Sequence, residues 1–310
     1  MMFGSSRKAA DLAAEITDRT AVQGRSLWRD ARDRFLRNRA SMVCLVILGL
    51  IIAFVVVGPL FARWSNEEID WAIMSVVREA GGPSIATGHF FGVDDLGRDL
   101  YSRVIQGTTT SLLVGLIGTA VALIVGTVYG IVAGFVGGRT DSVMMRFVDI
   151  LLAIPLTLVI ILLLVIAGRS FVMLFVALGA VGWLSMARIV RGQTLTLKNR
   201  EFIEAARAGG VSEMTIMYRH ILPNLLGVVI VYASLLVPEM ILAESFVSFL
   251  GLGISEPATS LGALIAKGAG TMAYGTLWQL GFPLFFYVAI IITMFFIGDG
   301  LRDALDPKDR

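Results

Sequence analysis

Cysteine, histidine and charged residues are scarce in this sequence. With one cysteine, Cys44, among 310 residues, the chain can form no intrachain disulfide and offers no cysteine cluster for a metal. Its two histidines, His89 and His220, lie far apart in the chain, which argues against a shared metal or a catalytic pair. Charged residues make up 16% of the chain and the net charge is +2, without the basic stripe of a nucleic-acid-binding protein.

A phosphate-binding loop is also missing. No glycine-rich turn followed by Lys-Ser or Lys-Thr occurs in the sequence, so we expect this chain to bind no ATP by the usual P-loop route. We likewise expect no catalytic, cofactor-binding or metal site in it. If its function requires ATP, a partner must supply the energy.

Apolar residues, by contrast, are abundant: 56% of the chain is hydrophobic and the mean hydropathy is +0.79. The charged residues cluster between long uncharged stretches, as in membrane proteins. About 20 apolar residues in a helix cross the roughly 30 Å of hydrocarbon, and six runs are long enough. We therefore predict an all-α integral membrane protein with six transmembrane helices. The expected spans are 42–62, 111–136, 147–168, 170–188, 222–243 and 280–299.

The distribution of Lys and Arg predicts the orientation of these spans. An even number places both termini on one side of the membrane. Of the 26 Lys and Arg residues, 20 fall on that side and 6 on the other, so both termini are expected in the cytoplasm. The first run is longer than the core of a cleaved signal peptide and is expected to be retained. The predicted organisation is a cytoplasmic tail at 1–41, the first span at 42–62, an extracytoplasmic loop or cap at 63–110, a transmembrane core at 111–305 and a cytoplasmic C-terminus at 306–310.

The N-terminal tail holds a candidate amphipathic helix. Leu27, Trp28, Ala31 and Phe35 recur at helical spacing, with arginines around them. Such a helix can lie in the headgroup layer before the first span. A solvated, charged tail is the alternative.

The most informative polar stretch is the segment at about 192–221, between two predicted spans on the expected cytoplasmic face. Its residues predict a short helix, a break at Gly209 and Gly210, and a second helix. Ala205 and Ala206 leave a low helix face that can seat in a groove of another protein. From the residues alone, a tight helical turn that joins two spans explains the segment equally well.

One pattern in this segment carries a resemblance. Glu204-Ala205-Ala206, then Gly210 after three residues, and Leu222-Pro223 downstream together resemble the EAA loop of ATP-binding-cassette (ABC) importer permeases. In that family the loop forms a coupling helix that sits in a cleft of the ATPase subunit. The resemblance implies an ATPase-docking site made of Glu201, Glu204, Ala205, Ala206, Gly209, Gly210 and Val211.

Three further stretches, 91–99, 244–253 and 298–307, resemble the corresponding segments of dipeptide and oligopeptide permeases. Within that family the chain is most similar to the C-type membrane subunits of oligopeptide permeases, from about residue 25 onward. It departs from the family pattern at Thr109 and Leu261, which concerns peptide-side detail and not the transporter assignment.

The resemblance implies a type I ABC importer architecture in the bacterial inner membrane, with oligopeptides as substrate. The implied partners are a second, related permease, two cytoplasmic subunits that hold ATP and Mg, and an extracytoplasmic peptide-binding protein. The chain itself would catalyse nothing. A secondary transporter and a membrane-embedded enzyme are the rival interpretations, and both lack support from polar clusters in the spans.

Charged residues near the fifth span are the other candidates, because a charge in hydrocarbon is costly and usually functional. Glu239 and Glu244 can line a translocation path, or they can mark the outer boundary of the membrane. At the inner boundary, the spacing of Arg146 and Asp149 predicts an ion pair on one helix face. Pro155 and Pro238 predict kinks around a path or simply local packing.

Overall fold

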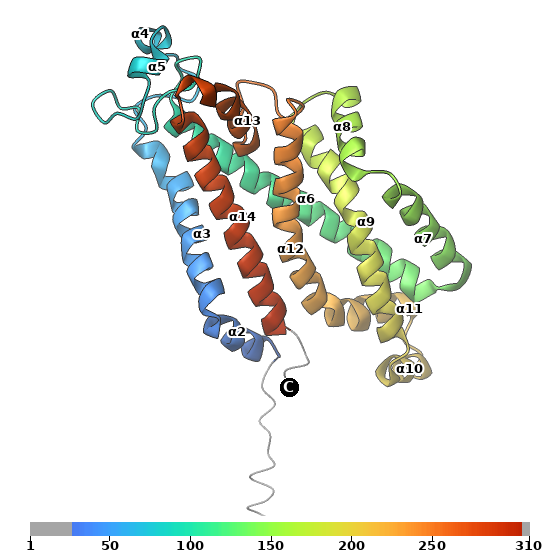
Figure 1. Ribbon diagram of the computed structural model, residues 1–310. Coiled ribbons are helices and arrows are strands. Elements are labelled where there is room, and N and C mark those ends of the chain that lie inside the picture. The colour runs from blue at the N-terminus through green and yellow to red at the C-terminus, as the bar shows by residue number, and fades with distance from the viewer. Residues whose placement is uncertain (1–26, 306–310) are drawn as a thin grey trace, which may run out of the picture.

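The computed structural model describes residues 27–305, and in that range the chain forms helices and no strand, which confirms the all-α prediction (Figure 1). Five helical segments are long and apolar enough to cross a membrane. They run from one end of an elongated bundle to the other. The principal helices are α3 (Arg39–Val57), α6 (Leu100–Val136), α9 (Phe171–Lys198), α12 (Leu222–Phe249) and α14 (Trp278–Leu305).

The third predicted span, 147–168, is a bent pair of helices and not one continuous helix, and the predicted kink at Pro155 is confirmed. The chain instead forms α7 (Gly138–Leu152) and α8 (Leu156–Ala167), which meet at an angle of 80°. Pro155 lies at the break, where it lacks a backbone N–H and disfavours helical geometry in the residue before it. Counted with this broken pair, the number of spans reaches the six that the sequence predicts.

Other predicted spans are too short, including the fourth, because α9 ends at Lys198 and not at 188. The second begins at Leu100 rather than at 111, where the carboxylate of Asp99 accepts a hydrogen bond from the Ser102 N–H at 2.8 Å. The fifth extends to Phe249 rather than ending at 243. The extensions at the start of α6 and at the end of α12 contain polar residues that interrupt the hydropathy pattern. Several of them, such as Arg103, Thr108 and Glu244, are buried inside the protein, and the helices continue through them.

The closest helix contact joins α6 to α9 and depends on glycine. Gly126, Gly130 and Gly134 recur once per turn along α6, and a Cβ at Gly130 would lie 2.5 Å from the carbonyl oxygen of Ala187. A Cβ at Gly134 would lie 2.8 Å from the carbonyl oxygen of Arg191. Small residues at this spacing let two helix backbones approach closely inside a membrane.

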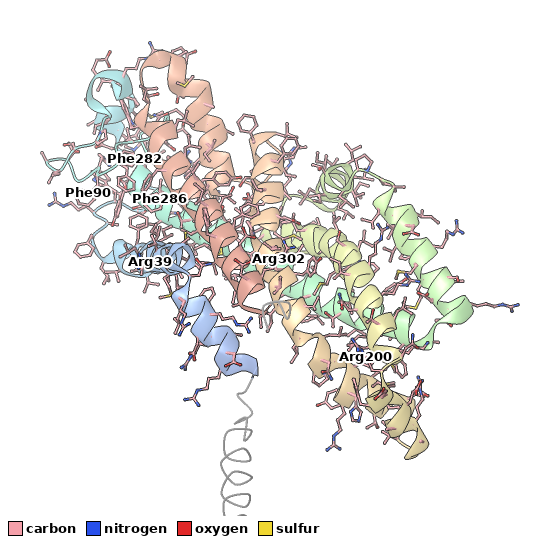
Figure 2. The ribbon with its side chains drawn as sticks, turned by 60° about the horizontal axis from the view of Figure 1, so that its bottom comes forward. Arg39, Phe90, Arg200, Phe282, Phe286 and Arg302 are labelled. Atoms are coloured by element: carbon pink, nitrogen blue, oxygen red, sulfur yellow. The ribbon has the colours of Figure 1, made fainter. Side chains whose placement is uncertain are left out.

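The two ends of the bundle differ. At one end lies a segment that we call the cap, residues 63–99. It contains two short helices, α4 (Trp71–Met74) and α5 (Val77–Ala80), and lies beside α13 (Leu261–Thr271). The other end carries α10 (Glu201–Ala208) and α11 (Glu213–Ile216), together with α2 (Leu27–Arg37) and the end of α14 (Figure 1). Both ends of the described chain therefore lie at the end that carries α10. Figure 2 labels Arg39, Arg200 and Arg302 towards this end, and Phe90, Phe282 and Phe286 towards the cap.

The predicted N-terminal helix exists as α2. Ala31 on it is buried, Phe35 is half-buried and the arginines at 32 and 37 are exposed. Phe35 packs against α14, because a Cβ at Gly300 would lie 3.3 Å from its ring. The helix is therefore amphipathic and packed on the bundle, and its place in the headgroup layer stays a prediction.

Candidate functional site

The segment between α9 and α12 folds as a helix, a break and a second helix, as predicted. α10 ends in a Schellman motif: Gly210 N–H donates to the carbonyl of Arg207 at 2.9 Å, and Val211 N–H donates to that of Ala206 at 3.1 Å. Gly210 has φ of +76°, a conformation that glycine adopts without steric cost. Ser212 then accepts a hydrogen bond from the Thr215 N–H and begins α11.

Only one residue of α10 is buried. Ile203 has no exposed surface and packs with Phe135, Ile216 and Ile221 in a cluster under the segment. The short helix is thereby fixed to the ends of α6 and α12. Its other side is uncovered, and the exposed predicted docking residues are Glu201, Glu204, Ala205, Gly209 and Gly210, with Ala206 and Val211 half-buried.

Contacts of two cationic side chains, Arg207 and Lys198, hold the segment in place. Arg207 donates to Glu213 at 3.2 Å, which ties α10 to α11, and its guanidinium lies 5.4 Å from the Phe135 ring. Lys198, at the end of α9, donates to the carbonyl of Phe135 at 2.8 Å. The result is an exposed helix on a stiff base, which is the shape that docking into a groove requires.

The segment continues directly into the fifth span. A π-helical turn, η2 (Met217–Ile221), joins α11 to α12, and the whole stretch Glu213–Phe249 forms one candidate span. His220 lies in this turn, whereas His89 lies in the cap, beside Asp70 and Asp99, as the sequence predicts. From α11 onward the segment is therefore joined to α12 by continuous helix.

Two arginines of α9 pair with aspartates of α7. Arg191 donates two hydrogen bonds to the carboxylate of Asp141, both at 2.6 Å, and Arg188 donates to Asp149 at 2.6 Å. The prediction that Asp149 pairs with Arg146 is therefore wrong, because Asp149 pairs with Arg188. Spacing along one helix predicted it, but the partner comes from a neighbouring helix 39 residues away.

The two glutamates predicted for a path lie on opposite sides of α12. Glu244 has no exposed surface. Ser248 donates to its carboxylate at 2.6 Å, Ser245 at 3.2 Å, and Ser111 of α6 at 3.4 Å. Ser260, the N-cap of α13, lies 3.3 Å from the Ser248 hydroxyl. Glu244 thus joins α6, α12 and α13 inside the subunit.

Glu239 is exposed on the surface of α12. Ten residues separate it from the end of the helix at Phe249, which corresponds to about 15 Å at 1.5 Å per residue. It therefore lies inside the helix and not at its end, but the continuous stretch Glu213–Phe249 is longer than the roughly 30 Å of hydrocarbon. The path and the membrane boundary both stay predictions for Glu239. Its neighbours on the same face are Tyr232, Leu235, Leu242 and Phe246.

At the opposite end, ion pairs hold the cap on the bundle. Arg98 donates to Asp94 of the cap at 2.8 Å and to Glu256, from the loop before α13, at 2.9 Å. Lys267 of α13 also donates to Glu256. Burial lowers the pKa of Lys267, and the neighbouring guanidinium groups of Arg103 and Arg98 lower it further. Three cations, Arg98, Arg103 and Lys267, therefore lie within 4 Å of the Glu256 carboxylate.

A second polar contact inside the cap involves His89. Its ring nitrogens lie 2.9 Å from Asp99 and 3.4 Å from Asp70, and Trp64 stacks on the ring at 4.7 Å. These residues bring together the start of α4 and the start of α6. Sequence reasoning did not predict this cluster, and its only visible signal was the density of carboxylates between residues 67 and 99.

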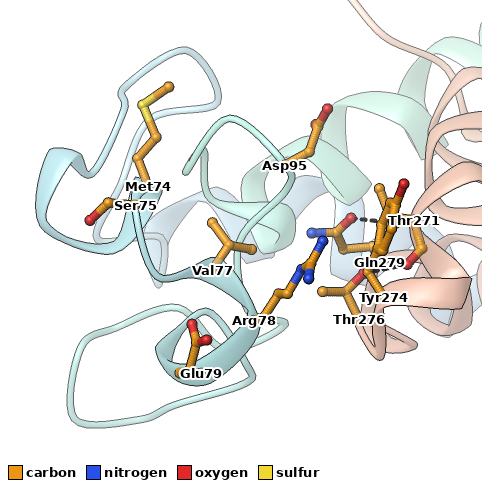
Figure 3. A pocket seen from close by; sticks show the side chains of 10 residues that line it. All are labelled: Met74, Ser75, Val77, Arg78, Glu79, Asp95, Thr271, Tyr274, Thr276 and Gln279. Atoms are coloured by element: carbon orange, nitrogen blue, oxygen red, sulfur yellow. Dashed lines mark hydrogen bonds between the residues drawn. The ribbon is translucent and has the colours of Figure 1, made fainter.

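A pocket of about 540 Å³ lies between the cap and the turn after α13 (Figure 3). Arg78 of α5 extends over the ring of Tyr274 at 4.4 Å. Behind them Thr271 donates to Gln279 at 2.7 Å. The pocket is open and its lining is about half polar, and it places cap residues next to the start of α14.

Comparison with known proteins decides the family. The family described as "Binding-protein-dependent transport system inner membrane component" matches residues 126–310. The chain belongs to this family. A second family model, the N-terminal TM domain of oligopeptide transport permease C, matches residues 26–78. The chain is accordingly a permease subunit of a transport system in the inner membrane, and a secondary transporter or a membrane-embedded enzyme is set aside.

Curated relatives cover almost the whole permease. The oligopeptide transport system permease protein OppC of Escherichia coli K12 is 52% identical, over 98% of this chain and 99% of that protein. OppC of Haemophilus influenzae is 49% identical, over 98% and 97%. The dipeptide transport system permease protein DppC of Bacillus subtilis is 41% identical, over 92% and 87%.

A solved structure supports the fold of the permease. A chain of the inward-facing MetNI methionine ABC transporter matches with a TM-score of 0.54 and 17% identity, over 66% of this chain and 96% of that chain. At this identity the match supports the fold alone. That fold agrees with the type I ABC importer architecture that the sequence resemblance implies.

Proposed function

We propose that this permease imports oligopeptides into the cytoplasm as one of two membrane subunits of an ATP-driven transporter. Peptide as the substrate is supported by the relatives named as oligopeptide permeases, with identities up to 52% over nearly the full chain. The second, related permease completes the translocation path. The chain hydrolyses no ATP itself, because it carries no P-loop.

The single observation that supports ATP coupling is the exposed helix α10 on its buried base. In this proposal Glu201, Glu204 and Ala205 enter a groove of a cytoplasmic ATP-binding subunit, and Ile203 holds the helix to the bundle. ATP and Mg bind to the two partner subunits and not to this chain. When the ATPases close, α10 moves, and the continuous stretch 213–249 carries that motion into the path.

This assignment also sets the orientation. The end with α10, α2 and the labelled arginines of Figure 2 faces the cytoplasm, in agreement with the positive-inside rule. The cap and α13 then face outward, where an extracytoplasmic peptide-binding protein delivers substrate. The ion pairs of Glu256 keep the cap fixed above the path entrance.

Purification in mild detergent tests the docking site. The wild-type chain should retain two ATPase subunits and a second permease, with ATPase activity in the eluate. Glu204→Arg reverses a charge on the exposed side of α10, so it should release the ATPases. Glu67→Arg is the control, because Glu67 is equally exposed but lies in the cap. Retention of ATPases by Glu204→Arg, or their loss from both variants, would contradict docking through α10.

A further inference from the structure

The side of α12 that carries Glu239 is largely open: Tyr232, Glu239, Leu242 and Phe246 are exposed, and only Leu235, at its edge, packs on α14 near Gly298. The opposite face packs on α6: a Cβ at Gly115 would lie 2.8 Å from Ile241 and 3.1 Å from Val237. At about 100° per residue, Glu239 lies roughly 160° around the helix from both of these residues. The face formed by Tyr232, Leu235, Glu239, Leu242 and Phe246 is therefore directed away from α6.

This face does not suit lipid. A lone carboxylate exposed to hydrocarbon is strongly disfavoured, and charged groups inside membranes face water-filled cavities or partners. The other glutamate of the helix, Glu244, receives three hydroxyl donors. Glu239 has neither a hydrogen bond nor an ion pair within residues 27–305. Its partner must therefore come from outside the described chain.

The chemistry of the face favours a peptide as that partner. A carboxylate attracts a cation, and the residues around Glu239 are aromatic or aliphatic, so they offer few directional contacts to side chains. Every peptide with a free N-terminus carries one ammonium group, whatever its sequence. A single anion on an otherwise apolar wall therefore suits a transporter that must accept many sequences.

On the basis of the proposed function, we propose that Glu239 binds the N-terminal ammonium group of a peptide as it crosses the membrane. The ammonium group would donate charge-assisted hydrogen bonds to the carboxylate. Because the wall around it is apolar and open, the peptide is held at one end only. Binding of this kind is strong enough to admit the substrate and weak enough to release it, as conduction requires.

Uptake by the complete transporter, reconstituted in vesicles with its binding protein and ATP, tests this site. The probes are an uncharged-side-chain tripeptide with a free N-terminus and its N-acetylated form. Glu239→Gln should lower the ratio of free to acetylated peptide uptake about tenfold relative to the wild type, since one charge-assisted hydrogen bond is lost. The binding protein is the same in both preparations, so its own selectivity cancels in this comparison. Glu239→Asp should restore most of the ratio.

One control variant and three possible outcomes test this proposal. Leu226→Gln changes polarity at an exposed position of α12 outside this face and should leave the ratio unchanged. Equal effects of Glu239→Gln on both peptides would overturn the proposal. Loss of the second permease from purified Glu239→Gln would also overturn it, in favour of an ion pair between subunits. Failure of the wild type to import either peptide would instead refute the proposed transport function.

A second measurement does not depend on acetylated peptide. The chain has one cysteine, Cys44, and it is buried, so Leu242→Cys, on the same exposed face, introduces a reactive thiol while Glu239 stays in place. Saturating free tripeptide should slow labelling of that thiol by a cationic methanethiosulfonate reagent at least threefold during ATP turnover. Unchanged labelling would show that the face does not meet the peptide and would overturn the proposal.

Discussion

At the scale of single residues, the two glycines that end α10 have different constraints. Gly210 has φ of +76°, while Gly209, the residue before it, has φ of −77°. No neighbouring atom lies within 4 Å of an added Cβ at Gly210. Only the backbone conformation therefore opposes substitution there, and the expected cost of a side chain is about 1–2 kcal/mol.

We predict that Gly210→Val disturbs the junction of α10 and α11 and lowers ATP-coupled peptide uptake several-fold. The matched variant Gly209→Ala should have little effect, because its backbone is already right-handed and its Cβ meets only ordinary contacts at 3.4 Å. Uptake per ATP hydrolysed is the measurement. Normal coupling in Gly210→Val would show that the shape of this turn does not matter to docking.

The buried carboxylate of Glu244 supports a second prediction. Glu244→Ala leaves the hydroxyls of Ser111 and Ser248 without their acceptor in a closed site, which typically costs about 1–3 kcal/mol. We expect a lower midpoint of thermal unfolding in detergent. Glu239→Ala, on the exposed side of the same helix, should leave the midpoint within error. Similar midpoints for both variants would contradict the joining role of Glu244.

The sequence predicted these two glutamates as equivalent, and the structure distinguishes them. Both interrupt one apolar run, so hydropathy could not assign them to different faces. The deciding partner, Ser111, lies 133 residues from Glu244. Pairings of this kind depend on tertiary packing, which one sequence does not reveal, and the same reason explains why Asp149 was assigned to Arg146 instead of Arg188.

At the scale of elements, the close approach of α6 and α9 depends on the absence of side chains. A Cβ at Gly130 would meet a backbone oxygen at 2.5 Å, and a backbone atom cannot rotate away as a flexible side chain can. Gly49 of α3 offers the contrast, since an added Cβ there meets nothing within 4 Å.

Gly130→Ala should therefore force the two helices apart and destabilise the fold by about 1–3 kcal/mol, the usual cost of overpacking. Gly49→Ala should be neutral or slightly stabilising, because alanine is the better helix former. Midpoints of thermal unfolding for the two variants decide the matter. A neutral Gly130→Ala would mean that α6 and α9 adjust their separation freely.

The sequence predicted which segments form helices, but it did not predict where a helix breaks or begins. Long apolar runs indicated the helices, and the pattern around Gly210 indicated the turn between α10 and α11. The break at Pro155 was noted only as a kink, because hydropathy averages over the two or three residues where a chain changes direction. The early start of α6 was missed because buried polar residues look like loop residues in a sequence.

At the scale of the whole molecule, ion pairs add to the aromatic and hydrogen-bonded contacts that attach the cap to the bundle, such as the stacking of Phe91 on Phe282. Glu256 meets Arg98 and Lys267, and Arg103 lies 3.9 Å away. Arg98 comes from the segment before α6 and Glu256 from 158 residues later. Removing this one anion would leave three cations close together.

Glu256→Gln should therefore loosen the cap, and backbone amides between residues 63 and 99 should exchange hydrogen at least tenfold faster. Glu79→Gln is the control, since Glu79 is exposed in the cap and takes part in none of these pairs. Hydrogen exchange read by mass spectrometry measures the change. Unchanged exchange in Glu256→Gln would show that apolar contacts alone hold the cap.

The unbroken helical stretch from α11 through η2 to α12 bears on the motion of this permease. The serine hydroxyls around Glu244 fix α12 near its cap end, so tilting can be large only at the other end. From Glu244 to Leu222 the helix measures about 33 Å, and a tilt of about 10° moves Leu222 by about 6 Å. In the proposed transport cycle, the helix would therefore act as a rod hinged close to one end: the end near α11 would move far, and the end near the cap would hardly move.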